Sequence, residues 1–413
     1  MTAFAHLRRG AKRARSIFQS HQHVWGRRWV AECRQCPFVP ERVLVLTKIS
    51  RYQIEKQVSP HLNEDRLKSR LIAIGADYDA ILSGHLRNKD TLMRTLEALQ
   101  RLNIECRIRD RYNIDDESVA WADLILSVGG DGTFLQAANL IADKSKPIIG
   151  INSDPEYSEG FLILSAKYTN DISKIFERLG AGEFKYLMRS RIRTTLYGDN
   201  IWEVPFHLHA HRSLNKSKTF YQSHYEATKP KGSELPKERP LPWLALNEVF
   251  IGECLSARMS TLYVNIDKDK GFKRVKSSGM CVTTGTGSTS WYRTINYLNP
   301  QMVKDVLSMV KYDKALSHEE IKKICFDFNT GLQYSAEELK LAYVIRDMVV
   351  KHIWPLPTHI NYRGFCDELT VRSQCYEGGL VIDGGVVAHF NLGTTAILQC
   401  LEDDQLCSII FPD

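Results

Sequence analysis

A glycine-rich loop between two apolar segments is the feature that most restricts how this chain can fold. Residues 123–128 form a short apolar run typical of a buried strand, and Phe134 to Ala142 has a helical pattern. Gly129-Gly130-Asp131-Gly132-Thr133 lies between them. A strand, a glycine turn and a helix in this order present backbone N–H groups at a helix N-terminus, where anions such as phosphate bind.

Strand and helix patterns alternate around this loop. Val43–Leu46 is short, apolar and β-branched, and Pro147–Ile151 has the same character. Between them, residues 61–102 have helical spacing of their leucines, and residues 104–108 alternate as in a strand. This β-α-β order predicts an N-terminal α/β domain built on a doubly wound parallel sheet.

After about residue 185 the pattern changes to short alternating strands separated by polar loops. We expect strands at Arg191–Leu196, Ala245–Ile251, Met259–Ile266 and Met280–Thr284. A second, β-rich domain with a β-sandwich-like architecture therefore follows the α/β domain. A chain of 413 residues is long enough for two domains of ordinary size.

The expected organisation divides the chain into four parts. A presequence covers residues 1–40, the α/β domain covers 41–185, the β-rich domain covers 186–398, and a C-terminal tail covers 399–413. Within the β-rich domain we expect a polar insertion near 207–240, where three prolines fall among few apolar residues, and a helical excursion near 300–353.

Positive charge is concentrated at the start of the chain. Seven Lys or Arg residues precede the first acidic residue, Glu32, and they match the formal net charge of +7 for the whole chain. An Arg-rich, acid-free segment is typical of a mitochondrial presequence and predicts the matrix as the location. The alternative is a basic tail that contacts RNA or anionic lipid. These basic residues are Arg8, Arg9, Lys12, Arg13, Arg15, Arg27 and Arg28.

The rest of the composition restricts the partners and the compartment. Because the remainder of the chain is near neutral, we expect no nucleic-acid partner. No run approaches the roughly 18 apolar residues of a membrane-spanning helix, so no membrane span is expected. Ten cysteines without a pairing pattern indicate free thiols in a reducing compartment.

The residue types of the glycine loop indicate phosphoryl transfer. Gly130, Gly132 and Thr133 are candidates for binding the phosphate groups. A carboxylate beside phosphates is electrostatically unfavourable unless it has a task, so Asp131 is the candidate general base or a group that places a nucleotide-bound Mg²⁺. The alternative is that Asp131 only caps the helix. The chain has no P-loop, no dinucleotide-binding Gly-x-Gly-x-x-Gly after a strand and no protein-kinase catalytic loop.

Gly-Gly-Asp-Gly-Thr resembles the signature shared by NAD kinases, diacylglycerol and sphingosine kinases and, in a variant form, phosphofructokinases. Three further segments resemble NAD kinases in order and spacing from about residue 42 onward. The residues of these motifs are most similar to those of the mitochondrial NAD kinases of animals, with which the chain shares Asn152-Ser153-Asp154-Pro155 and Ser277-Ser278-Gly279. The three segments are Leu246-Asn247-Glu248-Val249, Thr286-Gly287-Ser288-Thr289-Ser290-Trp291 and Val381-Ile382-Asp383-Gly384-Gly385.

The resemblance implies a fold, a reaction and partners. The fold is that of NAD kinases and diacylglycerol kinases. The reaction transfers the γ-phosphoryl group of ATP to the 2′-hydroxyl of the adenosine ribose of NAD, giving NADP, with Mg²⁺ bound to ATP and Asp131 as the base. NAD and ATP are the small-molecule partners, a homodimer is expected, and no protein metal ligands are assigned.

The resemblance also assigns contacts to NAD. Asn247 and Glu248 would contact the nucleoside, and Lys276 would supply positive charge near the dinucleotide. Thr286, Thr289 and Ser290 would bind the adenine or the phosphates. The residues alone leave ordinary alternatives, which are a strand-end turn at Asn247, a simple Thr/Ser-Gly turn, and a surface lysine. Ser278 stands where most NAD kinases have an aspartate.

Other readings of the same motifs stay open. A lipid kinase could use the same glycine loop, and a catalytically silent NAD-binding protein could keep Asp131 for structure alone. Two sets of alternating residues are expected to form solvated strand faces, although the histidines could bind a metal and the arginines a phosphate or a partner subunit. These sets are His207, His209 and His211, and Arg189, Arg191 and Arg193.

Overall fold

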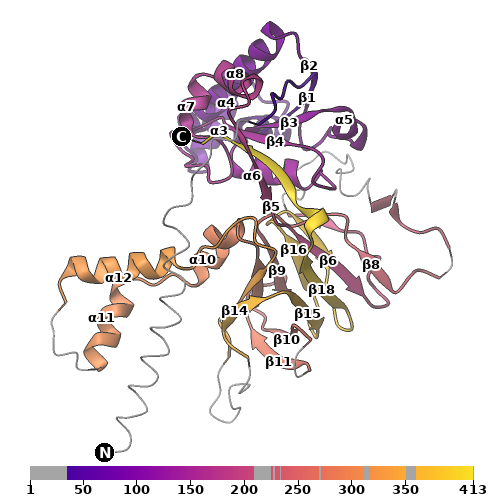
Figure 1. Ribbon diagram of the computed structural model, residues 1–413, viewed down its shortest axis with the longest axis vertical. Coiled ribbons are helices and arrows are strands. Elements are labelled where there is room, and N and C mark those ends of the chain that lie inside the picture. The colour runs from indigo at the N-terminus through magenta and orange to yellow at the C-terminus, as the bar shows by residue number, and fades with distance from the viewer. Residues whose placement is uncertain are drawn as a thin grey trace, which may run out of the picture. The chain divides into compact units, whose positions relative to one another are not determined.

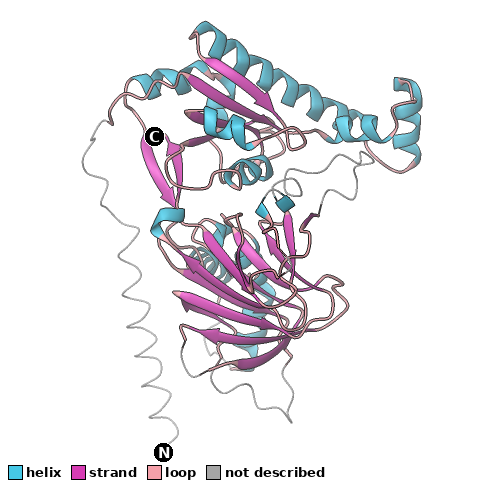
Figure 2. Ribbon diagram, turned by 90° about the vertical axis from the view of Figure 1, so that its right-hand side faces the viewer, coloured by secondary structure: helices cyan, strands magenta, loops and turns pink. Residues whose placement is uncertain are grey.

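Three β-sheets organise the chain (Figures 1 and 2). The computed structural model describes residues 35–208, 225–226, 228–232, 234–268, 271–310, 316–349 and 360–412. Among these residues the first sheet has the strand order β2-β1-β3-β4-β19-β5, in which β5 is antiparallel to β19 and the other pairings are parallel. Its strands are β1 (Arg42–Thr47), β2 (Glu105–Arg109), β3 (Leu124–Gly129), β4 (Ile148–Asn152), β5 (Lys185–Arg189) and β19 (Leu406–Ile410).

Helices cover both faces of the first sheet. Alternate residues of each strand point to opposite faces, so Val43 packs with Leu99 of α4 while Leu44 packs with Phe134 of α6. The expected α/β fold class is thereby confirmed. The helices are α2 (Arg51–Val58), α3 (Glu64–Ala73), α4 (Tyr78–Arg101), α5 (Asp116–Trp121), α6 (Asp131–Ala138), α7 (Ala166–Asn170) and α8 (Ser173–Gly180).

The second and third sheets form a β-sandwich, as expected. The second has the order β11-β10-β15-β18-β6-β8 and the third the order β14-β13-β12-β9-β16-β17-β7. Side chains from both sheets share one core, which includes Leu262 of the second sheet and Val249 of the third. The second sheet contains β6 (Ile192–Tyr197), β8 (Glu238–Pro240), β10 (Ser260–Ile266), β11 (Lys273–Ser277), β15 (Glu368–Ser373) and β18 (Thr395–Cys400).

The outer face of the third sheet carries short helices. Tyr292 of α10 packs on Cys281 and Val344, whose side chains leave that face. The third sheet contains β7 (Phe206–His207), β9 (Glu248–Glu253), β12 (Gly279–Thr283), β13 (Leu341–Arg346), β14 (Arg363–Cys366), β16 (Gly378–Ile382) and β17 (Val386–His389). The helical elements that follow β12 are η2 (Gly287–Thr289), α10 (Trp291–Ile295), α11 (Pro300–Met309) and α12 (His318–Thr330), and η3 (Glu402–Asp404) precedes β19.

Two expectations about the later part of the chain need correction. The helical excursion expected near 300–353 ends with α12, and strand β13 follows at Leu341–Arg346 because this apolar run pairs between β12 and β14. The tail expected at 399–413 contains β19, which lies between β4 and β5 in the first sheet. The chain therefore passes from the first sheet to the sandwich after β5 and returns after β18.

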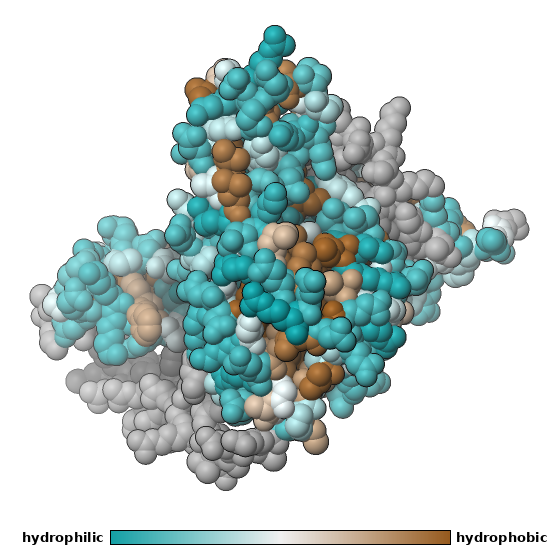
Figure 3. Space-filling view, turned by 90° about the horizontal axis from the view of Figure 1, so that it is seen from above, coloured by the Kyte–Doolittle hydropathy of each residue, from teal (hydrophilic) through white to brown (hydrophobic). Residues whose placement is uncertain are grey.

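In the described part of the chain, no helix has both the length and the apolar composition that a membrane crossing requires. The face seen in Figure 3 is mainly hydrophilic with a few hydrophobic patches.

Candidate functional site

The glycine loop connects β3 to α6, and its glycines differ in what they require. A Cβ at Gly129 would overlap the Thr133 side chain, so Gly129 allows the buried Thr133 to pack beneath the loop. A Cβ at Gly132 would meet no atom within 4 Å, and one at Gly130 would lie 3.6 Å from Ser158 Oγ. The packing of the chain therefore explains Gly129 but requires no glycine at Gly130 or Gly132, and Gly132 faces open space beside the first turn of α6. Gly130 is the N-cap of α6 and supplies no side-chain cap.

Asp131 does not cap α6, which removes the simplest structural alternative for this residue. Its carboxylate accepts hydrogen bonds from the backbone N–H groups of Phe161, at 2.9 Å, and Leu162, at 3.0 Å. These residues belong to the segment after β4, which turns at Gly160 with φ +69°. Asp131 therefore joins the loops that follow β3 and β4, and each of its oxygens keeps a lone pair for a further donor.

Two of the three alternating arginines, Arg189 and Arg191, are buried, so the expected solvated face was wrong for them, whereas the Arg193 side chain is 38% exposed. Arg191 is 0% exposed and donates to the carbonyls of Ala138 at 3.0 Å and Ile141 at 2.6 Å, beyond the C-terminal end of α6. Its Nε also donates to the Asp404 carbonyl at 2.6 Å. Arg193 pairs with the Asp404 carboxylate. Buried strands can carry charge when each donor finds an acceptor.

Arg189, the last residue of β5, connects the two domains at the glycine loop. Its side chain is buried, and Nη1 donates to the Thr286 hydroxyl at 3.2 Å. Burial lowers the pKa of Arg189 to about 10, while the negative charges of Asp131 and Glu337 oppose this shift. The guanidinium thus remains charged at neutral pH, bonded to Thr286 and under the influence of the negative charges of Asp131 and Glu337.

The Thr286 segment packs on the Asn247 backbone. The N–H of Thr284 donates to the Asn247 carbonyl at 3.0 Å, and the Thr283 hydroxyl donates to the same oxygen at 2.8 Å. A Cβ at Gly287 would overlap this carbonyl, so a glycine is needed there. Thr289 donates to the Thr286 carbonyl at 3.2 Å within its own turn. The segment therefore reaches the start of β9 through backbone contacts.

Glu248 is a buried carboxyl group with unused bonding capacity. It is 9% exposed, and its Oε2 atom and the Oδ1 atom of Asn247 are buried without a partner among the described residues. Burial and the negative charge of Asp383 raise the pKa of Glu248 to about 8, and the Ser290 hydroxyl partly opposes this. Asn247, Glu248 and Ser290 thus leave polar atoms that a ligand with hydroxyl and amine groups could satisfy.

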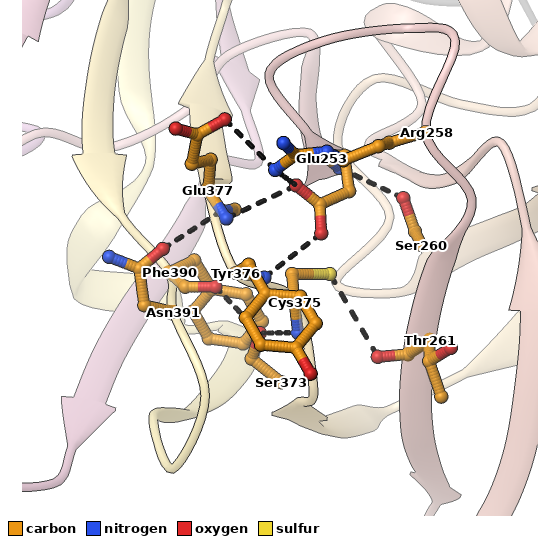
Figure 4. Close-up of polar contacts among 11 residues, drawn as sticks. Glu253, Arg258, Ser260, Thr261, Ser373, Cys375, Tyr376, Glu377, Phe390 and Asn391 are labelled. Carbon is orange, nitrogen blue, oxygen red and sulfur yellow. Dashed lines mark hydrogen bonds and ion pairs between the residues drawn. The ribbon is translucent and has the colours of Figure 1, made fainter.

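The opposite end of β9 shows how a buried glutamate is held when it has only a structural task (Figure 4). Glu253 is 8% exposed, and its carboxylate accepts from the backbone N–H groups of Tyr376 at 2.9 Å and Glu377 at 3.1 Å. Arg258 approaches within 4.0 Å and pairs with Glu377 at 3.0 Å. This contrast distinguishes Glu248 as the glutamate of β9 that is incompletely satisfied.

Some residues expected at the site lie in another sheet. Lys276 is on β11 of the second sheet, where its carbonyl accepts from Val349, whereas Glu248 is on β9 of the third sheet. Ser278, which replaces the usual aspartate, donates to the Asp347 carboxylate at 2.7 Å and accepts from Arg346 Nε at 2.8 Å. A carboxylate is therefore present beside Ser278, although another residue supplies it.

The histidine set is only partly described. His207 on β7 is buried, which contradicts the expected solvated face at this position, and His209 and His211 lie outside the described residues. Within the described ranges, no group of three or more His, Cys, Asp or Glu side chains could hold a metal ion.

The sequence analysis left a phosphate contact open for the arginine set but favoured a solvated face, and so it did not predict the burial of Arg189. Its alternation with Arg191 and Arg193 indicated a polar face, and no local pattern reveals that the face lies against α6 and the Thr286 segment. The burial of Arg189 can be recognised only when the elements that pack on β5 are known.

Comparisons with known proteins agree on one family. A sequence model of the ATP-NAD kinase N-terminal domain matches residues 55–181. The chain is 37% identical over 383 residues to "NAD kinase 2, mitochondrial" of Homo sapiens, which covers 90% of this chain and 85% of the relative. It is 34% identical over 398 residues to the protein of the same name from Xenopus tropicalis, covering 91% and 92%. A solved NAD kinase from Archaeoglobus fulgidus in complex with ATP is 16% identical, covers 90% of this chain and 93% of that chain, and has a TM-score of 0.46.

Proposed function

This chain belongs to the NAD kinase family, and from that premise we propose that it transfers the γ-phosphoryl group of ATP to the 2′-hydroxyl of the adenosine ribose of NAD in the mitochondrial matrix. The products are ADP and NADP. The observation that supports the mechanistic part is the hydrogen bond from Arg189 Nη1, at the end of β5, to Thr286, while the negative charge of Asp131 acts on the same guanidinium. We infer from it that the phosphate loop and the segment that packs on Asn247 form one site.

Asp131 acts as the general base in this proposal. A ribose hydroxyl is a weak nucleophile at neutral pH, so a carboxylate within hydrogen-bond distance accepts its proton as the new O–P bond forms. The backbone N–H bonds from Phe161 and Leu162 hold that carboxylate in position. The open space at Gly132 accommodates the phosphate oxygens near the amides that open α6, with Thr133 beneath.

Asn247 and Glu248 recognise the acceptor nucleoside. Their buried Oδ1 and Oε2 atoms lack partners, so polar groups of NAD satisfy them at little cost in desolvation, as donors to Asn247 Oδ1 and as donors or acceptors at the Glu248 carboxyl group, whose pKa is raised to about 8. We assign Thr286, Thr289 and Ser290 to the same site, whereas Lys276, on β11 of the second sheet, is proposed to supply positive charge toward the dinucleotide from the family resemblance alone. Leaving buried acceptors open favours ligands that supply matching donors and disfavours ligands that do not.

The magnesium ion enters with ATP. Mg²⁺ prefers phosphate and water ligands with one or two carboxylates, which the nucleotide together with Asp131 can provide. When bound, it would offset charge on the phosphate oxygens. We assign no separate protein metal site.

The experiment is a coupled assay for NADP from NAD, ATP and Mg²⁺, with protein that lacks residues 1–40. Asp131→Asn should lower kcat at least about 100-fold while calorimetry still detects NAD binding. Asp123→Asn is the matched control, because Asp123 also accepts from two backbone N–H groups, at Glu41 and Arg42, before the opposite end of β3. NAD binding without NADP formation by the wild type would identify a silent NAD-binding protein instead. If Asp131→Asn kept the wild-type kcat, the assignment of Asp131 as the general base would be wrong.

Residues 1–40 are proposed to direct the protein to mitochondria. Seven basic residues precede the first acidic residue, Glu32, and this supports the proposal. Fusing residues 1–40 to a fluorescent protein should send it to mitochondria, and replacing Arg8, Arg9, Arg13 and Arg15 by Gln should abolish import. A fusion that stays outside mitochondria would contradict the localisation. A homodimer is also proposed, from the family resemblance, and light scattering coupled to gel filtration measures its mass.

A further inference from the structure

Arg189 is a buried cation with unused hydrogen-bond donors. In the described part of the chain, Nη1 donates to Thr286 Oγ1 at 3.2 Å, and Nε is buried without a partner. Nη2 has no acceptor there and is not among the fully buried unpartnered atoms, so it retains access to space outside the protein. The described residues therefore accept hydrogen bonds from only part of the Arg189 guanidinium.

The neighbouring arginines show that this state is unusual. Arg191, two residues along, donates to three backbone carbonyls within 3.0 Å, and Arg193 pairs with Asp404. A buried charge normally has such partners, because an unpaired one carries a large desolvation cost. Arg189 has a neutral hydroxyl instead. The missing partner is therefore an anion that the protein does not supply.

The surroundings identify the chemistry of that anion. The charges that act on Arg189 are those of Asp131, the proposed base, and Glu337. A second carboxylate beside Asp131 would repel it, whereas a phosphoryl group must approach Asp131 for the reaction to occur. A planar guanidinium with two free donors matches phosphate oxygens.

We propose that Arg189 is a catalytic residue whose guanidinium binds the phosphoryl group during its transfer from ATP to the ribose hydroxyl. This inference rests on the proposed function. As the new O–P bond forms, the bond between the γ-phosphorus and the β,γ-bridging oxygen breaks, the hydroxyl proton passes to Asp131, and ADP leaves with the electron pair. Arg189 stays protonated throughout and stabilises the charge on the equatorial phosphate oxygens.

The geometry also explains why the residue sits where two domains meet. Arg189 comes from the first sheet and is held by Thr286 from the sandwich. Its donors are therefore oriented only when the phosphate loop and the Thr286 segment are in place together. Such coupling places positive charge at the reacting phosphorus in the assembled site.

The test compares Arg189→Met and Arg189→Lys with wild type, using steady-state kinetics and thermal unfolding. We expect Arg189→Met to lower kcat at least about 100-fold with the KM for NAD unchanged within about twofold. Its melting temperature should be unchanged or higher, because an unpaired buried charge is removed. Arg189→Lys should be intermediate, because it keeps the charge and loses the fork. Arg239→Met, which removes a buried arginine bonded to the Ile201 carbonyl, should instead lower stability and leave kcat unchanged.

A binding measurement identifies which phosphate is contacted. Calorimetry with Mg·ADP and aluminium fluoride, a mimic of the transferring group, should lose at least about 100-fold in affinity in Arg189→Met, with Mg·ADP alone nearly unaffected. A raised KM for NAD at unchanged kcat would show that Arg189 binds the NAD pyrophosphate and would overturn the proposal. Unchanged kcat and KM would overturn it as well. A wild-type protein that forms no NADP would instead defeat the proposed function, which keeps the two failures distinct.

Discussion

The carboxylate of Asp383 accepts a hydrogen bond from the backbone N–H of Asn247 at 2.7 Å. The same group accepts from Leu246 at 2.8 Å and from Glu248 at 3.1 Å. Asp383 adopts φ +47°, in the turn between β16 and β17, and this places its side chain against the first residues of β9. A residue far along the chain thus fixes the backbone from which Asn247 and Glu248 extend.

Replacing Asp383 should weaken both stability and NAD binding. In Asp383→Asn, an amide group faces N–H donors, so at least one of the three loses its acceptor. We expect a decrease of about 1–3 kcal/mol in the free energy of unfolding in urea and a rise in the KM for NAD. Asp267→Asn is the control, because Asp267 has φ +51° and accepts from Asp367 and Glu368 in the second domain. An equal rise in KM in both variants would contradict a local effect.

Glu248 should make the unliganded protein less stable as the pH rises. The pKa of Glu248 is about 8 in the folded state, against an ordinary value of 4.5, so between these values the folded protein holds a proton that the unfolded chain has released. Stability from this group is complete below about pH 4.5 and falls as the pH rises toward 8, by at most about 1.4 kcal/mol per pH unit. Urea unfolding at several pH values measures this slope.

The variant Glu248→Gln should remove that component of the slope. If Glu248→Gln kept the full pH dependence, another titrating group would be its source.

The glycines of the two loops should respond differently to alanine. Gly287→Ala places a Cβ on the Asn247 carbonyl and should reduce stability by about 1–3 kcal/mol. Gly132→Ala meets no atom within 4 Å, so its unfolding free energy should change little. Its Cβ nevertheless enters the space proposed for phosphates, and the KM for ATP should rise at least about tenfold. A normal KM for ATP would show that phosphates bind elsewhere.

Arg191 should act on stability through the carbonyls that it satisfies. Arg191→Met leaves the carbonyls of Ala138, Ile141 and Asp404 without this donor, and we expect a loss of roughly 2–5 kcal/mol in chemical denaturation. Arg101→Met is the control, because Arg101 is exposed and its pair with Glu97 should contribute less than about 0.5 kcal/mol. A similarly small effect for both would mean that water replaces the Arg191 guanidinium.

The sequence predicted the parts of the fold that depend on neighbouring residues. The strand, glycine loop and helix around Asp131 are encoded within about twenty positions, so their pattern was sufficient. Strand β19 was not predicted, because its pairing partner β4 lies more than 250 residues earlier and the five residues carry no pattern of their own. Strand β13 was also missed, because its apolar run fits a buried helix as well as a strand.

Some residues of the candidate site were likewise predictable from their sequence neighbours, and others were not. The residues of the glycine loop follow from local chemistry, whereas Asn247, Glu248 and Thr286 were grouped only by resemblance, and their roles in binding stay predictions. The burial of Arg189 and Arg191 was wrongly predicted, since alternation distinguishes the two faces of a strand but does not show what covers each face.

The position of β19 has a consequence for biosynthesis. The strand at Leu406–Ile410 lies between β4 and β5, so the first sheet remains divided until the ribosome has released these residues. The α/β layer therefore cannot complete its folding as it leaves the exit tunnel, even though most of its residues are synthesised first. The first sheet thus closes only after β18 of the sandwich has been made, so the order of synthesis places its completion after the strands of the second domain.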